Sequence, residues 1–508
     1  MSIDGQQAVL ALLADPASYD PPPSRVERID THISSVFLAG ERAFKLKRAV
    51  RLPFLDFSTL CLREQACRRE LAINRRTAPD LYEALLPITR AADGVLRLGG
   101  EGTVEDWLVV MRRFRQEDLF DRLALRGALD RPLLSDLADA VAALHDSAEP
   151  RPDWGGADGL RHTIDTNAAC FALDIPGLFD PVLAGEVTEH SLDWLIRLAP
   201  LLEERRRSGW VRHVHGDLHL GNICLFQGRP TLFDAIEFNE TFACVDSLYD
   251  LSFLLMDLHA RGLTQEASWV FNRYQERRDD LEGMAALPLF LSLRAAIRAH
   301  VAAATARAGA DPAQRDKAMA HLHLARRYLS PAEPRLLAVG GLSGSGKSRL
   351  GRDLAPLLGA APGAVVIRTD VIRKRLMGVA PETRLPPEGY SPEMTQRTYE
   401  TFLNDCQRAL AAGQAVVADA VFAREDQRRA MAELAEHMRV PFDGLWLQAS
   451  PEAMRERVAK RVKNASDATP EVLDQQLTYD LGNITWTQID SSGLKEETFR
   501  SARLHLGL

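Results

Sequence analysis

The stretch 341–348, Gly-Leu-Ser-Gly-Ser-Gly-Lys-Ser, decides the fold of the second half of the chain. It follows a short apolar run at 335–340 and precedes a helical stretch at 349–358, which is the context that a P-loop requires. Glycines let backbone N–H groups wrap around phosphates, and the N-terminus of the next helix favours anions. We therefore expect Lys347 on the β- and γ-phosphates of ATP and the Ser348 hydroxyl on Mg²⁺. The expected nucleotide-binding residues are Gly341, Gly344, Ser345, Gly346, Lys347 and Ser348.

The same half places acidic residues at one edge of its predicted parallel sheet. The apolar run 364–369 ends at Asp370, and the run 415–418 ends at Asp419. Ligands bind at the carboxyl ends of the strands in such sheets. Arg373 follows Asp370 by about one helical turn, so we expect it to face the same pocket and contact the substrate.

A second phosphate-handling signature stands at 215–222, His-Gly-Asp-Leu-His-Leu-Gly-Asn. The spacing of Asp217 and Asn222 matches a kinase catalytic loop, in which the carboxylate accepts the hydroxyl proton and the amide oxygen binds magnesium. The apolar stretch 231–237 is expected to be a strand that carries Asp234 as the second Mg²⁺ ligand, because a hard cation prefers carboxylate oxygen.

Residues upstream of this loop supply the expected nucleotide-binding groups of the first site. Lys45 and Lys47 lie two apart and share one face of a strand, so either lysine can hold the phosphates. We favour Lys45, although the spacing does not choose between them. Glu70, on the next helix, is expected to pair with that lysine. The segment 107–114, which includes Met111, is expected to be the hinge that offers backbone groups to adenine.

The first loop and the following Asp234 resemble the aminoglycoside phosphotransferase and choline kinase-like group. The resemblance covers about residues 25–330 and implies a kinase-like fold, with Asp217 as base and Asn222 and Asp234 as metal ligands. Leu220 stands where family members often have proline, and 233–237 reads Phe-Asp-Ala-Ile-Glu, which weakens the case for an antibiotic substrate. An inactive kinase-like domain is the alternative. Glu237, Glu240 or Asp257 are candidates for an acidic acceptor wall.

The P-loop half resembles small kinases of the gluconate kinase, polynucleotide 5′-kinase and zeta-toxin type. The resemblance implies Asp370 as the general base, and Arg457 and Arg461 of a basic helix as lid arginines over the phosphates. Asp419 suits a Walker B-like acid that acts through magnesium-bound water. The alternatives are a structural or substrate-anchoring role for Asp370 and a solvated face for the basic helix.

The whole chain resembles bacterial proteins described as bifunctional phosphotransferase/ATP-binding proteins. We expect a bilobed kinase-like α+β domain at 1–330, with a small lobe at about 25–114 and a helical lobe at about 115–330. An α/β P-loop domain with a parallel sheet is expected at 335–508, after the linker Leu-Ser-Pro-Ala-Glu-Pro at 329–334.

Composition narrows the function further. The 508 residues carry a formal net charge of −8, which gives no global attraction to nucleic acid or to a membrane surface. Six cysteines without a CxxC pair fit a reducing cytoplasm, and we expect no apolar run of membrane-spanning length.

The leading hypothesis is a cytoplasmic enzyme with two kinase domains, each using ATP and Mg²⁺ to phosphorylate a hydroxyl of a small molecule. An amino sugar, sugar or amino alcohol is expected for the first domain. One alternative makes one domain a regulatory nucleotide-binding module. A second, less favoured, makes the P-loop domain a nucleic-acid 5′-end kinase. The acceptors, the choice of ATP or GTP, the oligomeric state and any coupling between the domains do not follow from the sequence.

Overall fold

The computed structural model describes residues 6–52, 55–175, 177–309, 311–460 and 466–508. It divides into two compact units. The first unit is Met1–Leu160 with Leu202–Asp257, and the second is Arg161–Leu201 with Leu258–Leu508. The domain boundary expected at 329–334 stays a prediction. Helices that precede it in the sequence belong to the same compact unit as the P-loop.

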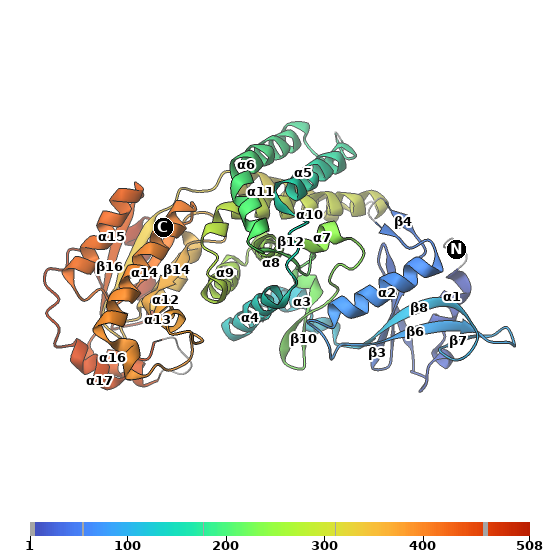
Figure 1. Cartoon of the computed structure of the whole chain (residues 1–508), viewed down its shortest axis with the longest axis horizontal. Coiled ribbons are helices and arrows are strands. Elements are labelled where there is room, and N and C mark those ends of the chain that lie inside the picture. Colours follow the sequence, from blue (N-terminus) through green and yellow to red (C-terminus); the bar gives the residue numbers. More distant parts are fainter. Residues whose placement is uncertain (1–5, 53–54, 176, 310, 461–465) are drawn as a thin grey trace. The chain divides into compact units, whose positions relative to one another are not determined.

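The first unit contains a six-stranded antiparallel sheet (Figure 1). Its strands, in spatial order, are β1 (Val26–Asp30), β2 (Ser34–Ala39), β3 (Arg42–Lys47), β8 (Thr103–Arg112), β6 (Tyr82–Arg90) and β7 (Leu96–Leu98). The strand predicted to carry Lys45 and Lys47 is β3. Strands β1, β6 and β7 are less buried, and a half-exposed strand has a weaker apolar signal.

Both faces of this sheet are covered by apolar side chains. Helix α1 (Gln7–Ala14) packs Val9 and Leu13 on the face of Phe37 and Phe44. Helix α2 (Leu60–Asn74) packs on the opposite face, which includes Leu38 and Val109. Since neighbouring residues of a strand point to opposite faces, this two-sided burial explains the nearly continuous apolar runs of β2 and β8.

The rest of the first unit surrounds the catalytic loop at 214–222. The loop lies between β9 (Val211–His213) and β10 (Ile223–Phe226). The remaining elements are β4 (Arg51–Leu52), β5 (Leu55–Asp56), α3 (Phe120–Leu125), α4 (Arg131–Ser147), β11 (Arg229–Leu232), α7 (Glu240–Ala243), β12 (Cys244–Asp246) and most of α8 (Ser247–Ala260). The strand expected at 231–237 ends at Leu232, because Asp234 adopts a left-handed backbone conformation with φ 62°.

The second unit contains a five-stranded parallel sheet with the order β14-β15-β13-β16-β17 (Figure 1). The strands are β13 (Leu336–Gly340), β14 (Val365–Arg368), β15 (Val416–Asp419), β16 (Phe442–Gln448) and β17 (Thr487–Asp490). Its helices are α12 (Lys347–Leu354), α13 (Thr369–Leu376), α14 (Pro392–Ala411), α15 (Glu425–Met438), α16 (Pro451–Ala459), α17 (Pro470–Gln476) and α18 (Lys495–Leu506). The predicted fold class, a kinase-like part followed by an α/β P-loop part, is confirmed.

The second unit also holds helices that precede the P-loop in the sequence. They are α9 (Thr264–Arg278), α10 (Leu287–Gly309), α11 (Pro312–Tyr328), and parts of α5 (Gly156–Ala172) and α6 (Pro181–Arg207). The expectation that no apolar run reaches membrane-spanning length is wrong by length and composition. Among the described residues the segment Glu282–Gly309 is long and apolar enough to cross a membrane, but 72% of its apolar window is buried inside the structure.

Candidate active sites

Asp250 of α8 holds the backbone of the catalytic loop of the first unit through hydrogen bonds. Its carboxylate accepts hydrogen bonds from His215 N (3.2 Å) and Gly216 N (2.9 Å), and it lies 3.1 Å from His145 Nε2. Gly216 has φ 81°, and a Cβ there would lie 2.8 Å from Phe242 O, so only glycine fits. The loop backbone is therefore fixed before any substrate binds.

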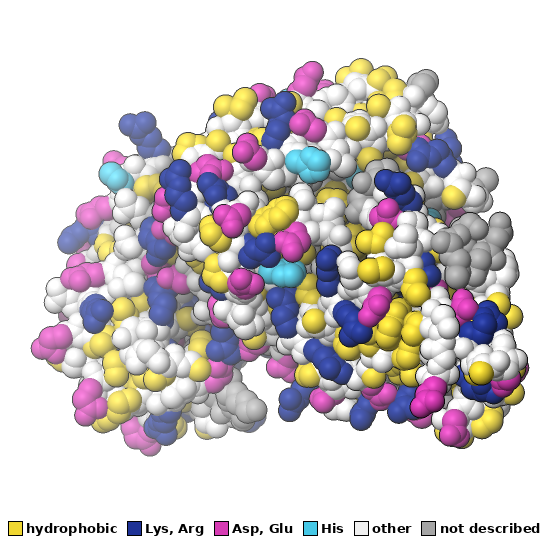
Figure 2. Space-filling view, turned by 45° about the vertical axis from the view of Figure 1, so that its right-hand side comes forward, with side chains coloured by type: hydrophobic (Ala, Val, Ile, Leu, Met, Phe, Trp, Pro, Cys, Tyr) yellow, Lys and Arg dark blue, Asp and Glu magenta, His cyan; other side chains and the backbone are white. Residues whose placement is uncertain are grey.

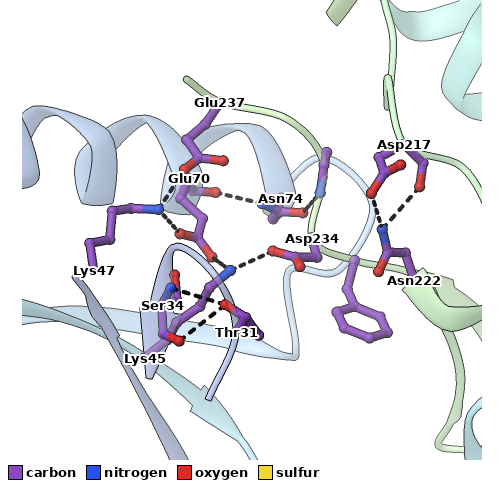
Figure 3. Close-up of polar contacts among 12 residues, drawn as sticks. Thr31, Ser34, Lys45, Lys47, Glu70, Asn74, Asp217, Asn222, Asp234 and Glu237 are labelled. Carbon is purple, nitrogen blue, oxygen red and sulfur yellow. Dashed lines mark hydrogen bonds and ion pairs between the residues drawn. The ribbon is translucent and has the colours of Figure 1, made fainter. Parts of the chain in front are cut away.

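The two predicted catalytic-loop residues contact each other. Asn222 Nδ2 donates to Asp217 O and to Asp217 Oδ2, both at 3.0 Å (Figure 3). Because this amide nitrogen is engaged, the amide oxygen is the Asn222 atom that suits a metal ion. His219 Nε2 lies 3.5 Å from the same Asp217 oxygen. The arrangement orients the Asp217 carboxylate without shielding it, since that side chain is 39% exposed.

Both candidate lysines of β3 converge on Glu70 of α2 (Figure 3). Lys45 Nζ lies 2.8 Å from Glu70 Oε1 and 2.5 Å from Asp234 Oδ1. Lys47 Nζ lies 2.6 Å from Glu70 Oε2 and 2.5 Å from Glu237 Oε1. The structure thus brings together Lys45, Glu70 and the predicted metal ligand Asp234. Lys45 is the lysine next to that ligand.

The surroundings of the two lysines differ. The Lys47 side chain is 1% exposed and lies over the Phe57 ring, whereas Lys45 is 12% exposed beside the more open Asp234. Burial alone would raise the pKa of Glu70, but the two ammonium groups lower it to about 2. Burial raises the pKa of the Glu237 carboxyl. This electrostatic network favours Lys45 for contact with a nucleotide and Lys47 for structural pairing.

Helix α2 also fixes the backbone that carries Asp234. Asn74 donates to Glu70 O (2.9 Å), and its amide oxygen accepts from Ala235 N (2.9 Å). Tyr82 OH accepts from Asp234 N at 3.2 Å. Sequence analysis assigned no role to Asn74. The available signal was its position four residues after Glu70, on the same face of the helix.

The other predictions for the first unit meet with mixed outcomes. Met111 lies near the end of β8, paired with Ala43 and Tyr82, and its place in an adenine hinge stays a prediction. The acidic wall was a poor expectation for Glu237, whose carboxylate is buried against Lys47. Glu240 pairs with Arg151, and Asp257 accepts from Leu220 N.

The P-loop of the second unit leaves no room for a side chain at Gly341 or at Gly344. A Cβ at Gly341 would lie 2.5 Å from Leu447 O, and one at Gly344 would lie 2.6 Å from Met454 O. Gly346, with φ 99°, begins α12. Lys347 Nζ donates to Leu342 O at 3.0 Å, and Gln476 accepts from Ser343 N at 2.8 Å. The predicted glycine pattern therefore has a steric basis in the fold.

This loop lines a cavity of about 1380 Å³. The predicted residues that line it are Gly344, Ser345, Gly346, Lys347, Ser348, Asp370, Arg373, Asp419 and Arg457. Such a volume exceeds what one small ligand needs, so nucleotide and acceptor can share it. Asp370 lies in the first turn of α13, not at the end of a strand as expected, where the helix dipole favours an acid.

The predicted magnesium ligands of this site flank one buried guanidinium. Arg368 Nε lies 3.2 Å from Asp419 Oδ2, and Arg368 Nη2 lies 3.5 Å from Ser348 Oγ. Sequence analysis missed Arg368, although a charge at the end of the apolar run 364–369 was a visible signal. Hydroxyl and carboxylate oxygens suit Mg²⁺, which commonly takes its other ligands from phosphates and water.

One wall of the cavity includes Asp467, which forms a buried ion pair. Lys374 Nζ lies 2.7 Å from both carboxylate oxygens of Asp467, which also accepts from Tyr390 OH at 2.6 Å. Arg373 stacks on the Tyr390 ring and donates to Gly389 O at 2.9 Å. Arg373 is thus held at the cavity wall beside Asp370, as a substrate contact requires.

In the basic helix, one arginine reaches the P-loop, and other basic residues pair with acids on the surface. Arg457 of α16 reaches the P-loop, with Nη1 3.5 Å from Gly344 O. Arg455 pairs with Asp474, and Lys460 pairs with Glu456 four residues earlier. The solvated-face alternative therefore describes Lys460 but not Arg457. Arg461, the other predicted lid arginine, lies outside the described residues.

The two folds define the class of the chain as a kinase-like part joined to a P-loop part, and residues 336–479 match the AAA domain family. Over 488 residues the chain is 30% identical to uncharacterized proteins of Mycobacterium tuberculosis and Mycobacterium bovis, covering 93% of this chain and 94% of theirs. The chain belongs to the family of these mycobacterial proteins.

Solved structures are similar to each part separately. A choline/ethanolamine kinase family protein from Mesorhizobium loti is 14% identical, with 64% of this chain and 95% of that chain covered and a TM-score of 0.39. The aminoglycoside phosphotransferase APH(4)-Ia is 15% identical, with 61% and 96% covered and a TM-score of 0.40. A gluconokinase from Sinorhizobium meliloti is 22% identical, with 35% and 93% covered and a TM-score of 0.26. The P-loop character predicted for the second half of the chain is confirmed by the family match at residues 336–479.

Proposed function

We propose that the protein is a phosphotransferase with two active sites, each moving the γ-phosphoryl group of ATP to a hydroxyl of a small molecule. The observation that carries the proposal is the meeting of Lys45, Glu70 and Asp234 beside the Asp217–Asn222 loop. The intact P-loop and its cavity support the same chemistry in the second unit. For the first site the proposed acceptor is an amino sugar, a sugar or an amino alcohol.

In the first unit, Asp217 accepts the proton of the acceptor hydroxyl as the oxygen attacks the phosphorus. Lys45 binds the phosphates, and Glu70 keeps its ammonium group at the mouth of the site. In the second unit, Lys347 and the P-loop backbone hold the phosphates, Asp370 takes the acceptor proton, and Arg457 stabilises the transferring group. Arg373 orients the acceptor.

Mg²⁺ would neutralise phosphate charge in both sites, held by Asn222 and Asp234 in one and by Ser348 and Asp419 in the other. The oxygen donors of these residues fit such an ion. Among the described residues no group of three or more His, Cys, Asp or Glu side chains could hold a metal ion. Mg²⁺ commonly takes its remaining ligands from substrate phosphates and water.

A nucleic-acid acceptor for the second unit is less favoured. The net charge is −8, and on the described part of the face in Figure 2 basic and acidic side chains are interspersed. Binding to a polyanion is stronger where cations cluster. A cytoplasmic location is also proposed, supported by six free cysteines, Cys61, Cys67, Cys170, Cys224, Cys244 and Cys406.

The second candidate function is regulatory, with the P-loop unit sensing nucleotide and no transfer occurring there. The contact of Arg368 with both Ser348 and Asp419 supports it, because a guanidinium on these oxygens opposes the binding of the Mg²⁺ that transfer requires. Nucleotide binding without turnover in the second unit would support this candidate.

The test is mass spectrometry of a metabolite extract incubated with ATP, Mg²⁺ and the purified protein, its D217N variant or its K347A variant. We expect two sets of phosphorylated products, each lost with one variant. If every product survives D217N, the first unit is not a kinase of these metabolites. If K347A removes no product although wild type binds nucleotide there, the regulatory candidate replaces the kinase proposal for the second unit.

A further inference from the structure

Arg368, the last residue of β14, contacts groups from three different elements of the second unit. Its side chain is 2% exposed. Nε lies 3.2 Å from Asp419 of β15, Nη2 lies 3.5 Å from Ser348 of α12, and Nη1 lies 3.5 Å from Glu276 of α9. The Arg368 guanidinium therefore contacts both proposed Mg²⁺ ligands. It also contacts Glu276, which precedes the predicted P-loop domain in the sequence.

Glu276 is a largely buried carboxylate surrounded by three arginines. Its side chain is 11% exposed, and its carboxylate lies 3.4 Å from Arg273, 3.6 Å from Arg352 and 3.5 Å from Arg368. Burial alone would raise the pKa of Glu276, but the charges of these arginines lower it, so the group is ionised at neutral pH.

Helix α9 cannot move away from β14 easily. One turn before Glu276, the Asn272 amide donates to Ala364 O (3.1 Å) and accepts from Val366 N (2.6 Å). These bonds use the free edge of β14, which is the first strand of the sheet. Asn272 and Glu276 lie on one face of α9 and meet the strand at Val366 and Arg368, so the helix and the strand are in fixed register.

A guanidinium and a divalent cation cannot share the same two oxygens at full strength, because both are positive and need the same lone pairs. Release of Arg368 from Asp419 would be strongly unfavourable if it left the guanidinium buried without an anion. Glu276 removes that cost, since it already lies within 3.5 Å of the same group.

We propose that Arg368 is a resident cation at the Ser348–Asp419 pair that gives way when Mg²⁺ arrives with nucleotide, and that Glu276 is the positioning residue that retains the displaced guanidinium. The proposal rests on the proposed binding of Mg²⁺–nucleotide by the second unit. It makes a helix from the region before residue 330 part of the P-loop site.

The experiment measures binding of a fluorescent ADP analogue to the full-length chain, first in EDTA and then with rising MgCl₂. The signal that K347A abolishes belongs to the second unit, which separates it from any binding in the first. We expect E276Q to raise the Mg²⁺ concentration for half-maximal enhancement about tenfold, a change of about 1.4 kcal/mol. Its affinity in EDTA should stay within about twofold of wild type, because Glu276 is not among the residues that line the P-loop cavity.

Two further variants test whether Glu276 acts through Arg368. R368M, which removes the competing cation, should lower the Mg²⁺ requirement, and E276Q/R368M should behave as R368M does. E282Q is the control for another ion pair between the region before residue 330 and the P-loop part, since Glu282, which is 57% exposed, lies 2.5 Å from Arg408 of α14. It should leave the Mg²⁺ dependence unchanged.

The outcomes are distinguishable. An unchanged Mg²⁺ requirement in R368M overturns the proposal. Equal shifts in E276Q and E282Q also overturn it, because they indicate a general loosening of the segment 264–286. If E276Q does not fold, R368M alone decides by the same criterion. If wild type has no K347A-sensitive binding, nucleotide binding by the second unit fails, and this proposal fails with it.

Discussion

Lys45 and Lys47 stand two residues apart on one strand face, yet their surroundings assign them different tasks. Lys45 contacts Asp234, which is 41% exposed, while Lys47 contacts Glu237, which is 5% exposed. Glu70 serves both. The sequence predicts that one lysine matters for nucleotide binding, but it cannot say which one, because the difference lies in residues almost 190 positions away.

K47M should therefore mainly lower the free energy of unfolding, and K45M should mainly lower phosphoryl transfer by the first site. K47M leaves the buried Glu237 without its cation and should cost about 3–5 kcal/mol of unfolding free energy. K45M should cost less, since Asp234 is open to water and Glu70 keeps Lys47, but it should reduce transfer by the first site at least about 100-fold. Denaturant titration and product formation measure the two effects. Equal destabilisation by both variants would contradict the division of roles.

The Glu70 carboxyl gives the first unit a pH dependence. Burial would raise its pKa, but the lysines lower it from 4.5 to about 2. A lowered pKa stabilises the fold above about pH 4.5, and this contribution is lost as the pH falls toward 2. Between about pH 5 and pH 3, wild type should lose about 2 kcal/mol more unfolding free energy than E70Q, at 1.36 kcal/mol per pKa unit. Parallel curves for the two proteins would contradict an ionised Glu70.

At the scale of elements, the loops were predictable and their supports were not. The P-loop and the catalytic loop each lie within eight consecutive residues, so their chemistry can be predicted from local spacing. Asn74 supports Ala235 across 161 positions, and Glu276 reaches Arg368 across 92. Such contacts depend on how elements pack, which a single sequence does not encode in any local pattern.

The packing of α16 on the P-loop gives an element-scale prediction. G344A places a methyl group 2.6 Å from Met454 O at a residue with φ 87°, so α16 and Arg457 must shift. Nucleotide affinity of the second unit should fall more than about tenfold. G378A is the matched control, because Gly378 also has positive φ (68°) but no atom lies within 4 Å of its Cβ position. It should lose only about 1–2 kcal/mol of stability and keep its affinity. Similar affinity losses in both variants would point to backbone strain alone.

At the scale of the whole molecule, the sequence places a domain boundary at a proline-containing linker, while the compact second unit begins well before it. Composition and loop chemistry change at 329–334, and those are the signals that a boundary prediction uses. Packing between α9 and β14 leaves no such signal. The kinase-like and P-loop character of the two halves could be predicted, but the sharing of α9 could not.

Fragments test this sharing. A fragment that begins at residue 335 loses Asn272 and Glu276, so Ala364 O, Val366 N and Arg368 lose partners. Each unmet buried group costs about 1–3 kcal/mol. The fragment should melt at least several degrees below one that begins at residue 161, which contains every residue of the second unit. Equal melting temperatures would support an independent domain at 335–508.

The amide of Asn272 has a further consequence for the life of the protein in the cell. An open β-strand at the border of a sheet invites other chains to add to it, and proteins use covers of several kinds to prevent such aggregation. In β14 the cover is a helix that the chain makes before it makes the sheet. Helix α9 is thus already synthesised when β14 emerges from the ribosome. A gene split at the linker would produce a sheet whose edge strand β14 lacks this cover. Solubility, as much as catalysis, can hold such a fusion together.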